Sequence, residues 1–386
     1  MNHATRNPSP RSSRRPVILA LALLAAGAGL FLVTRPPGGG GATSLASPTA
    51  SFGPVPTSTA VAGTPAATGP VATLPPSTPP SAQPIAAGPF AGAVLIADRA
   101  NGRLLVIDNS GKILWHFPGS SSALPAGQAF TADDAFLDPS GTTIVANDES
   151  HQMIDRIDIA TGTIVWQYGT YGKAGSRTGQ LHTPDDAYPL ANGDIVVADI
   201  ENCRILEIAP DKSIARQWGQ TGVCRHQSGV TFARPNGDTP LPDGGLLVTE
   251  IGGSRVVRLA ADGSVVFDIH VPVAYASDAQ LDTSGNVVVA DYSTHGQVVS
   301  VSPAGRLVWR YAPTAGSAAL NHPSLATPLA NGLVAVNDDF RHRVVVIDPV
   351  AGTIVWQYGH TDVHGSAPGY LNTPDGHEPV PAGFFQ

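Results

Sequence analysis

A glycine turn that recurs at nearly regular intervals constrains the fold of this chain more than any other feature. The turn glycines follow one another at spacings of 52, 51, 41, 47 and 51 residues, and they are Gly141, Gly193, Gly244, Gly285, Gly332 and Gly383. One unit, residues 183–219, contains four short segments of alternating apolar and polar residues, separated by Gly, Asn, Asp and Pro. That pattern predicts four β-strands, here called a to d, joined by tight turns. Four-stranded units at this period are typical of the blades of a β-propeller.

The number of blades and the closure of the ring follow from the ends of the repeat. Each strand b ends in an acidic residue, and six such residues occur: Asp98, Asp148, Asp199, Glu250, Asp291 and Asp338. The first unit begins directly at its strand b, residues 92–98, and the last residues, TPDGHEPVPAG (373–383), match the strand a of other units. We therefore expect an all-β, six-bladed β-propeller whose C-terminal strand closes blade one, an arrangement that removes open sheet edges.

Residues 89–386 resemble six-bladed propellers of the NHL-repeat type. The resemblance is carried by LHTPDDA, LNHPSLA and LNTPDGH before strand a, and by VADIENCR, VTEIGGSR and VNDDFRHR across the b–c turn. The ending TIVWQYG, at 163–169 and 353–359, also looks like PQQ (quinoprotein-type) repeats. NHL-like propellers include binding scaffolds, lyases and lactonases, so the resemblance implies an architecture more than an activity. In the amidating-lyase relatives His on strand a binds zinc, and here only His377 clearly lies on strand a.

The segment before the repeat has a different composition. Residues 1–15 form a basic tail, and residues 16–34 carry no charge over a length that suffices for a helix across a bilayer. Four Arg precede this stretch and one follows it, so we expect a transmembrane signal-anchor with a cytoplasmic N-terminus; a cleaved signal peptide is the alternative. Residues 35–88 are rich in Pro, Ala, Thr and Ser without apolar periodicity, which predicts a disordered linker. The propeller, residues 89–386, is then expected on the extracytoplasmic side of the cell membrane.

Charge and composition exclude several classes of protein. Residues 89–386 carry 17 Lys and Arg against 30 Asp and Glu, a balance that disfavours nucleic-acid binding and favours cationic or polar ligands. The 42 Gly and 35 Pro argue against a coiled coil or helical bundle. Apolar runs such as GDIVVADI can bury a core, which excludes a wholly disordered chain.

Several conspicuous residues have structural roles in this prediction. An Arg follows the strand-b acid by five positions in four blades, where an ion pair would lock the b–c turn: Asp98/Arg103, Asp199/Arg204, Glu250/Arg255 and Asp338/Arg343. Five Trp on or near strands d are expected to pack between blades: Trp115, Trp166, Trp218, Trp309 and Trp356. Cys203 and Cys224, the only cysteines, leave the same face of one blade, so a disulfide is expected outside the cytoplasm.

The candidate site lies on the face where the d–a and b–c connections emerge. Most His of the repeat lie in these connections, and the turns of the opposite face contain none. Strand a begins on the same face and lines the central channel. Eight and seven residues before the a–b glycine it carries recurring carboxylates: Asp133, Asp134, Asp185, Asp186, Asp278 and Asp375. The rotation of the propeller relates these positions, so we expect a carboxylate ring at the channel mouth. The predicted ligand-binding residues are Asp133, Asp134, Asp185, Asp186, Asp238, Asp278, His182 and His322.

Carboxylates held close together repel one another and favour a bound cation. Oxygen ligands suit Ca²⁺, and a neighbouring His would admit Zn²⁺, so the predicted metal ligands are Asp185, Asp186, Asp375 and His377. A hydrated polar channel without an ion is the alternative. The chain contains no G-x-S-x-G, H-E-x-x-H, P-loop or Rossmann fingerprint.

These features predict a monomeric, membrane-tethered propeller that binds an extracellular ligand or protein partner on its His/Asp-rich face. The alternative is a metal-dependent NHL-like lyase or hydrolase with its site at the channel mouth, where the carboxylates and His377, His182 or His322 would hold the metal and act as acid or base. A quinoprotein dehydrogenase is less well supported, because such proteins usually have eight blades. Arylsulfotransferase-like propellers share W-x-Y strand endings, but no catalytic His for that chemistry is identifiable. The sequence identifies neither a catalytic residue nor a substrate.

Overall fold

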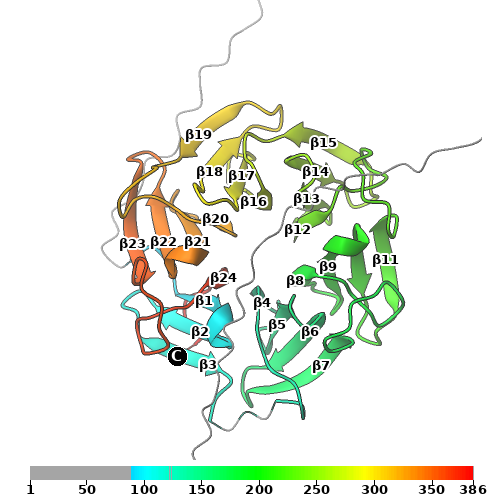
Figure 1. Ribbon diagram of the computed structural model, residues 1–386, viewed down its shortest axis with the longest axis horizontal. Coiled ribbons are helices and arrows are strands. Elements are labelled where there is room, and N and C mark those ends of the chain that lie inside the picture. Colours follow the sequence, from blue (N-terminus) through cyan, green and yellow to red (C-terminus); the bar gives the residue numbers. More distant parts are fainter. Residues whose placement is uncertain (1–87, 121, 123, 386) are drawn as a thin grey trace, which may run out of the picture. The chain divides into compact units, whose positions relative to one another are not determined.

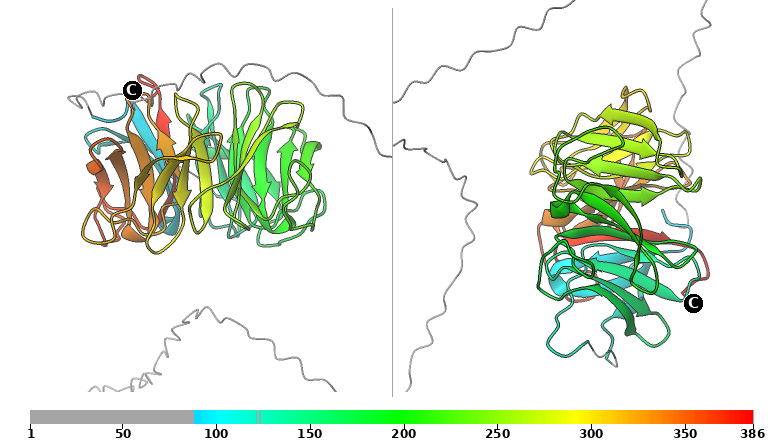
Figure 2. Two further views of the ribbon diagram at one scale, coloured as in Figure 1. Left: turned by 90° about the horizontal axis from the view of Figure 1, so that it is seen from above. Right: turned by 90° about the vertical axis from the view of Figure 1, so that its right-hand side faces the viewer.

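The computed structural model describes residues 88–120, 122 and 124–385, which form six four-stranded antiparallel sheets around a central axis (Figure 1). With the innermost strand first, blade one consists of β24 (Pro374–Val380), β1 (Ala93–Asp98), β2 (Arg103–Asp108) and β3 (Ile113–Phe117). Blade two consists of β4 (Ala135–Leu137), β5 (Thr143–Asp148), β6 (Met153–Asp158) and β7 (Thr163–Gly169). Blade three consists of β8 (Pro184–Pro189), β9 (Ile195–Asp199), β10 (Arg204–Ile208) and β11 (Ile214–Gly219). Blade four consists of β12 (Pro235–Pro240), β13 (Leu246–Glu250), β14 (Arg255–Leu259) and β15 (Val265–His270). Blade five consists of β16 (Ala276–Leu281), β17 (Val287–Asp291), β18 (Val298–Val301) and β19 (Leu307–Tyr311). Blade six consists of β20 (Ala326–Pro328), β21 (Val334–Asp338), β22 (Arg343–Asp348) and β23 (Thr353–Gly359). Seen from the side, the strands run from one face of the propeller to the other (Figure 2).

The predicted six-bladed propeller and its closure are confirmed. β24, the last strand of the described residues, pairs antiparallel with β1, the first of them, so that Val380 lies opposite Ala93 and His377 opposite Ile96. Blade one is thus assembled from both ends of the described chain, and β1 has a hydrogen-bonding partner on each side. The inner edge of β1, which would otherwise be free, is covered.

The hydrophobic core consists of six clusters, one between each pair of neighbouring blades. Both faces of each sheet are therefore covered, and strand b buries nearly every residue rather than every second one. β9 (IVVAD) and β17 (VVVAD) are buried along their whole length. This is why their sequences read as continuous apolar runs.

The b–c turns of three blades share one structure, a single 3₁₀ turn followed by a left-handed residue. These turns are η1 (Arg99–Asn101), η2 (Ile200–Asn202) and η3 (Asp339–Arg341). In each blade the predicted Arg donates to the strand-b acid: Arg103 to Asp98, Arg204 to Asp199 and Arg343 to Asp338, at 2.6 to 2.7 Å. The predicted ion-pair lock is confirmed for these three blades.

In blade four the predicted pair is wrong. Arg255 binds Asp268 on β15, 2.5 Å away, and Glu250 instead accepts from His226, whose Nδ1 lies 2.9 Å from Oε2. His226 comes from the preceding d–a connection, so the strand-b acid receives its hydrogen bond from outside its own turn. Sequence spacing within the blade could not show this exchange.

Replacing Arg343 with Met is expected to destabilise the fold strongly. The side chains of Arg343 and Asp338 are 1 % and 0 % exposed, and removing one partner of a buried pair leaves an uncompensated charge, at a cost of about 3 kcal/mol. The control is Arg258→Met, because its partner Asp243 is half exposed and exposed pairs contribute less than about 1 kcal/mol. Urea unfolding of the two variants measures the difference, and equal losses would contradict a buried lock.

The predicted disulfide is also confirmed, since Cys203 and Cys224 are bonded with their Cα atoms 5.1 Å apart. Trp115, Trp166 and Trp356 pack between blades as predicted, each donating its indole N–H to a backbone carbonyl of the next blade. Within the described part of the chain, no helix is long and apolar enough to cross a membrane. The expected membrane helix at 16–34 and the linker up to residue 87 lie outside the described residues.

Candidate functional site

The predicted carboxylates meet at one end of the central channel. A small pocket there is lined by residues of all six blades: Asp134, Asp185, Asp186, Asn236, Ser277, Asp278, Ser324, Leu325 and Asp375. Asp133 and Asp238 are buried beside it. Burial raises the pKa of both carboxyl groups, and the charge of Asp185 adds to each shift. The structure therefore brings together all seven predicted Asp residues. Their role in binding remains a prediction.

β-Bulges explain how two consecutive carboxylates can both face the channel. In β8 the register with β9 shifts between Asp185 and Tyr188, and β16 has the same shift between Ala276 and Ala279. A regular strand would point successive side chains to opposite faces, whereas a bulge re-aims one of them. As a result both Asp185 and Asp186 line the pocket.

A single guanidinium crosses the mouth. Arg99 Nη1 lies 2.7 Å from Asp133 Oδ1 and 2.6 Å from Asp375 Oδ2, and Nη2 lies 2.7 Å from Glu149 Oε2. These three carboxylates raise the pKa of Arg99, although burial opposes the shift. One positive charge thus faces a larger set of acids.

Burial and mutual repulsion keep protons on these acids. Burial, with the Asp375 charge second, raises the pKa of Asp134 to about 8. Burial raises the pKa of Asp185, Asp186 and Asp238 well above the usual aspartate range, and neighbouring carboxylates add to the shift. Burial and repulsion thus favour the protonated forms of these groups, and a bound cation would displace such protons.

Some carboxylate oxygens at the mouth are buried without any hydrogen-bond partner among the described residues. They are both oxygens of Asp238, Oδ2 of Asp186 and Oδ2 of Asp339. Asp238 and Asp339 are 0 % exposed and Asp186 is 3 % exposed. An unpaired buried carboxylate is costly, so each of these groups either holds a proton or needs a positively charged partner.

Side chains fill the channel directly beneath the carboxylates. The rings of Phe136 and Tyr188 stack with centroids 3.8 Å apart. Gln280 Nε2 lies 3.1 Å from Tyr188 Oη and 2.9 Å from Asp278 Oδ2. The site is therefore a pit that opens to the face with the b–c turns.

The geometry that best fits a metal ion differs from the predicted ligand set. Carboxylate oxygens of Asp133, Asp134 and Asp185 lie within 4.8 Å of one another, so of the predicted ligands only Asp185 belongs to this group. His377 is 1 % exposed, and its Nδ1 is hydrogen-bonded to Asn337 Oδ1. Burial lowers the pKa of His377 to about 3. An oxygen-only group of this kind favours Ca²⁺ or Mg²⁺ over Zn²⁺.

The histidines lie in the predicted connections but do not converge on the pit. His151 stacks on Tyr171 with centroids 4.5 Å apart, and His360 packs on Tyr370 at 4.2 Å. The backbone N–H of His182 donates to Asp199 as part of a turn. The concentration of His on one face thus reflects several local contacts.

His322 is the exception, because it belongs to an aromatic group at the rim. Its ring lies 4.8 Å from Tyr292 and 4.3 Å from Phe340, and Tyr292 lies 5.4 Å from Tyr275. Phe340 is 45 % exposed. Burial and then the charges of Asp339 and Asp375 raise the pKa of Tyr292, which places this aromatic rim beside the carboxylates.

Sequence reasoning missed one ring of residues. Arg99, Glu149, Tyr292 and Asp339 each directly follow the strand-b acid of their blade, and all four interact with the carboxylates of the mouth. The sequence contained the information needed to find them, because the position after the strand-b acid is rotationally equivalent in every blade. Aligning it across the six units would have placed these residues at the mouth.

The described chain is thus a six-bladed, repeat-type β-propeller with an acidic pit at one end of its channel. Residues 209–370 match the family model described as outer membrane protein assembly factor BamB, whose repeats are of the PQQ type. No curated protein matches the chain.

Three solved structures show the breadth of similar folds. A protein of unknown function from Bacteroides caccae has a TM-score of 0.53 at 17 % identity and covers 74 % of this chain and 97 % of its own. A nidogen/laminin complex has 0.50 at 16 %, covering 74 % and 97 %. A streptogramin B lyase has 0.48 at 16 %, covering 75 % and 86 %. At such identities the likeness shows the fold alone.

Proposed function

We propose that this chain is a membrane-tethered, extracytoplasmic propeller that binds a divalent cation, Ca²⁺ in the first instance, in the acidic pit. The face around the pit binds a ligand or protein partner. The observation that carries this proposal is the set of buried, unpaired oxygens of Asp186, Asp238 and Asp339. A cation bound by the neighbouring Asp133, Asp134 and Asp185 would neutralise the charge that these acids share.

The remaining features support the binding role and the location. The aromatic rim of Tyr275, Tyr292, His322 and Phe340 offers apolar contact area next to the charged pit, a combination common in binding surfaces. The disulfide is a bond that persists outside the cytoplasm. The uncharged stretch at 16–34, flanked by Arg, supports a tether in the membrane.

Isothermal titration of CaCl₂ into the metal-stripped full chain in detergent at pH 8 tests the proposal. We expect one ion per chain to bind, with MgCl₂ as the comparison ion and elemental analysis as a check on the untreated protein. A chain that binds neither ion and is purified without metal would contradict the proposed function.

A second candidate, a metal-dependent lyase or hydrolase, is favoured by one specific arrangement. Burial lowers the pKa of His322, so its imidazole is neutral at pH 7 and could accept a proton at the rim above the carboxylates. If a substrate is found, His322→Gln should abolish turnover and leave Ca²⁺ binding unchanged. Loss of both, or of neither, would count against this role.

A further inference from the structure

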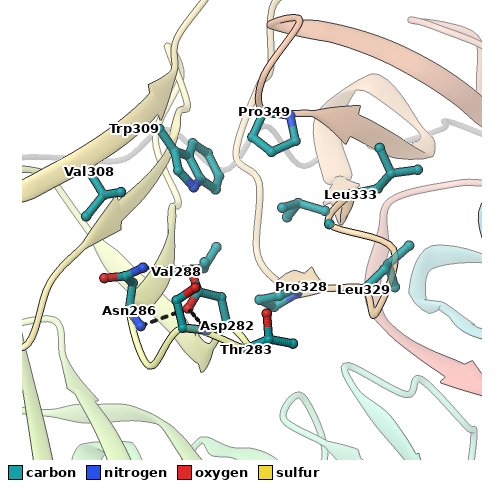
Figure 3. Close-up of a pocket in the computed structure, with 13 residues that line it drawn as sticks. Asp282, Thr283, Asn286, Val288, Val308, Trp309, Pro328, Leu329, Leu333 and Pro349 are labelled. Carbon is teal, nitrogen blue, oxygen red and sulfur yellow. Dashed lines mark hydrogen bonds between the residues drawn. The ribbon is translucent and has the colours of Figure 1, made fainter. Parts of the chain in front are cut away.

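A second pocket lies on the opposite face, between blades five and six. It is a shallow, open pocket with a cavity volume of about 60 Å³, and it is lined by the a–b turns of both blades, by Trp309 of β19 and by Pro349. Figure 3 shows Trp309 and Pro349 facing each other across the opening, with Leu333 and Leu329 on one side and Asn286 and Asp282 on the other. We call it the Trp309 pocket. It is remote from the acidic pit, because the a–b and c–d turns lie on the other face of the propeller.

Trp309 differs from the other four tryptophans of the d strands in the groups that lie against its ring. An aromatic ring or a cation lies against each of the others: Phe385 on Trp115, Lys212 on Trp166, Arg216 on Trp218 and Phe90 on Trp356. Among the described residues no such group lies on Trp309. Trp309 instead lines the Trp309 pocket.

The indole N–H of Trp309 is also unpaired within the described part of the chain. Trp115 donates to the carbonyl of Ile159, which directly follows the last residue of strand c in the next blade. Pro349 occupies the equivalent position in blade six, directly after Asp348, but Trp309 makes no bond to it. A ligand with a carbonyl acceptor would therefore find a free donor at the wall of an apolar pocket.

The described chain begins next to this pocket. Asn331 Nδ2, in the a–b turn of blade six, donates to the carbonyl of Pro89 at 2.9 Å. Gly88, Pro89 and Phe90 line a neighbouring pocket together with Pro328 and Leu329, and these last two residues also line the Trp309 pocket. The segment that precedes Gly88 thus joins the propeller beside the unpartnered tryptophan.

That segment has the composition that such a pocket accepts. Residues 74–87, LPPSTPPSAQPIAA, contain five prolines and no charged residue. Proline-rich chains favour the polyproline II helix, which advances about 3.1 Å per residue and has unpaired carbonyls. Such helices dock in aromatic-lined grooves.

We propose that residues 74–87 dock in the Trp309 pocket in polyproline II conformation, with the indole N–H of Trp309 donating to a backbone carbonyl of the segment. The covalent connection at Gly88 gives the segment a high effective concentration, so a small pocket suffices to hold it. Phe90 and Phe385 show the same principle, because residues that flank the propeller at its first and last strands already cover Trp356 and Trp115. Docking would hold the tether on the face opposite the acidic pit and leave the pit accessible.

Disulfide trapping in the detergent-solubilised full chain tests this proposal. Ser284 is exposed and lines the pocket, so the pair Ser81→Cys with Ser284→Cys reports docking. The control pair is Ser81→Cys with Ser110→Cys, because Ser110 is exposed and adjoins Asn109, which contacts Gly88. An undocked segment would reach Ser110 at least as readily as Ser284.

We expect the Ser284 pair to form at least about tenfold faster under mild oxidation, as a raised effective concentration requires. Trp309→Phe, which keeps an aromatic ring but removes the N–H, should reduce that rate about fivefold, the usual effect of one lost hydrogen bond. The matched variant Trp166→Phe should leave it unchanged, since the N–H of Trp166 is bonded to Pro210. Equal rates for the two cysteine pairs, or no effect of Trp309→Phe, would overturn the proposal.

Discussion

A chain that ends at Asn372 is expected to lose its cooperative fold. The deletion removes β24, the innermost strand of blade one, and with it the buried residues Asp375, His377 and Val380. β1, which is buried along its whole length, would then present an unpaired, apolar inner edge, and such edges promote aggregation. We expect insoluble protein, or a melting transition lowered by tens of degrees.

The matched control is a chain that ends at Val380. It keeps β24 and loses only the last turn with Phe384 and Phe385, which are partly buried against the cluster between blades one and two. A shift of only a few degrees is expected there, since a 300-residue domain moves by about 2–4 °C per kcal/mol. If the chain ending at Asn372 melted within about two degrees of the full chain, ring closure by β24 would not be what holds the fold together.

The second large effect is expected at the acidic pit, where stability should depend on pH and on Ca²⁺ together. Burial raises the folded-state pKa of Asp134 from 3.8 to about 8, so the folded state holds a proton that the unfolded chain releases. The stability linked to that proton is fully present below about pH 4 and is lost as the pH rises through 8. Without metal, the melting temperature should therefore fall between pH 5 and pH 8.

Calcium should reverse this loss at pH 8 and have little effect at pH 5, because protons compete with the ion for the carboxylates. At an ion concentration of about 100 times Kd, binding adds about 2.7 kcal/mol, which corresponds to a rise in melting temperature of about 5 °C or more. A chelator should have the opposite effect on protein purified with its metal. Differential scanning calorimetry at the two pH values measures all three results.

Replacing Asp185 and Asp186 together with Asn should abolish the calcium response and, at pH 8, raise the melting temperature of the metal-free protein. Both side chains carry strongly raised pKa values from burial and neighbouring charges, so neutral side chains relieve repulsion. The control pair Asp211→Asn with Asp262→Asn makes the same change in net charge at exposed c–d turns and should keep the response. A double variant at 185 and 186 that is less stable without metal, and still responds to Ca²⁺, would refute the cation site.

The fold was largely predictable because a repeat encodes it several times over. Alternating strands, turn glycines at a steady spacing and an acid at the end of each strand b fixed six blades, and the match between residues 373–383 and other units located the closing strand. The same rotational equivalence predicts from the sequence alone that Asp133, Asp185 and Asp375 lie together. The pattern of residues within one unit suffices to predict these features, because every blade is the same four-stranded sheet packed between two neighbouring blades.

The electrostatics of the site depended on contacts between blades, which spacing along the chain does not encode. Arg99 of blade one meets Glu149 of blade two across the mouth, and His226 replaces Arg255 as the partner of Glu250. The sequence pattern placed the histidines on one face of the propeller. In the structure they contact aromatic residues of nearby connections instead of meeting at the pit, as His151 does with Tyr171 and His360 with Tyr370.

The sequence alone thus determined the blade count, the closing strand, the disulfide and the positions from which carboxylates enter the channel. Only the tertiary structure decided which acids lack a partner, which oxygens approach closely enough for one ion, and that Trp309 alone of its set has neither a covering group nor a hydrogen-bond acceptor among the described residues. The physical reason is that strand patterning is local to one blade, whereas charge compensation and pocket filling are decided where two blades, or the first and last strands of the propeller, come into contact.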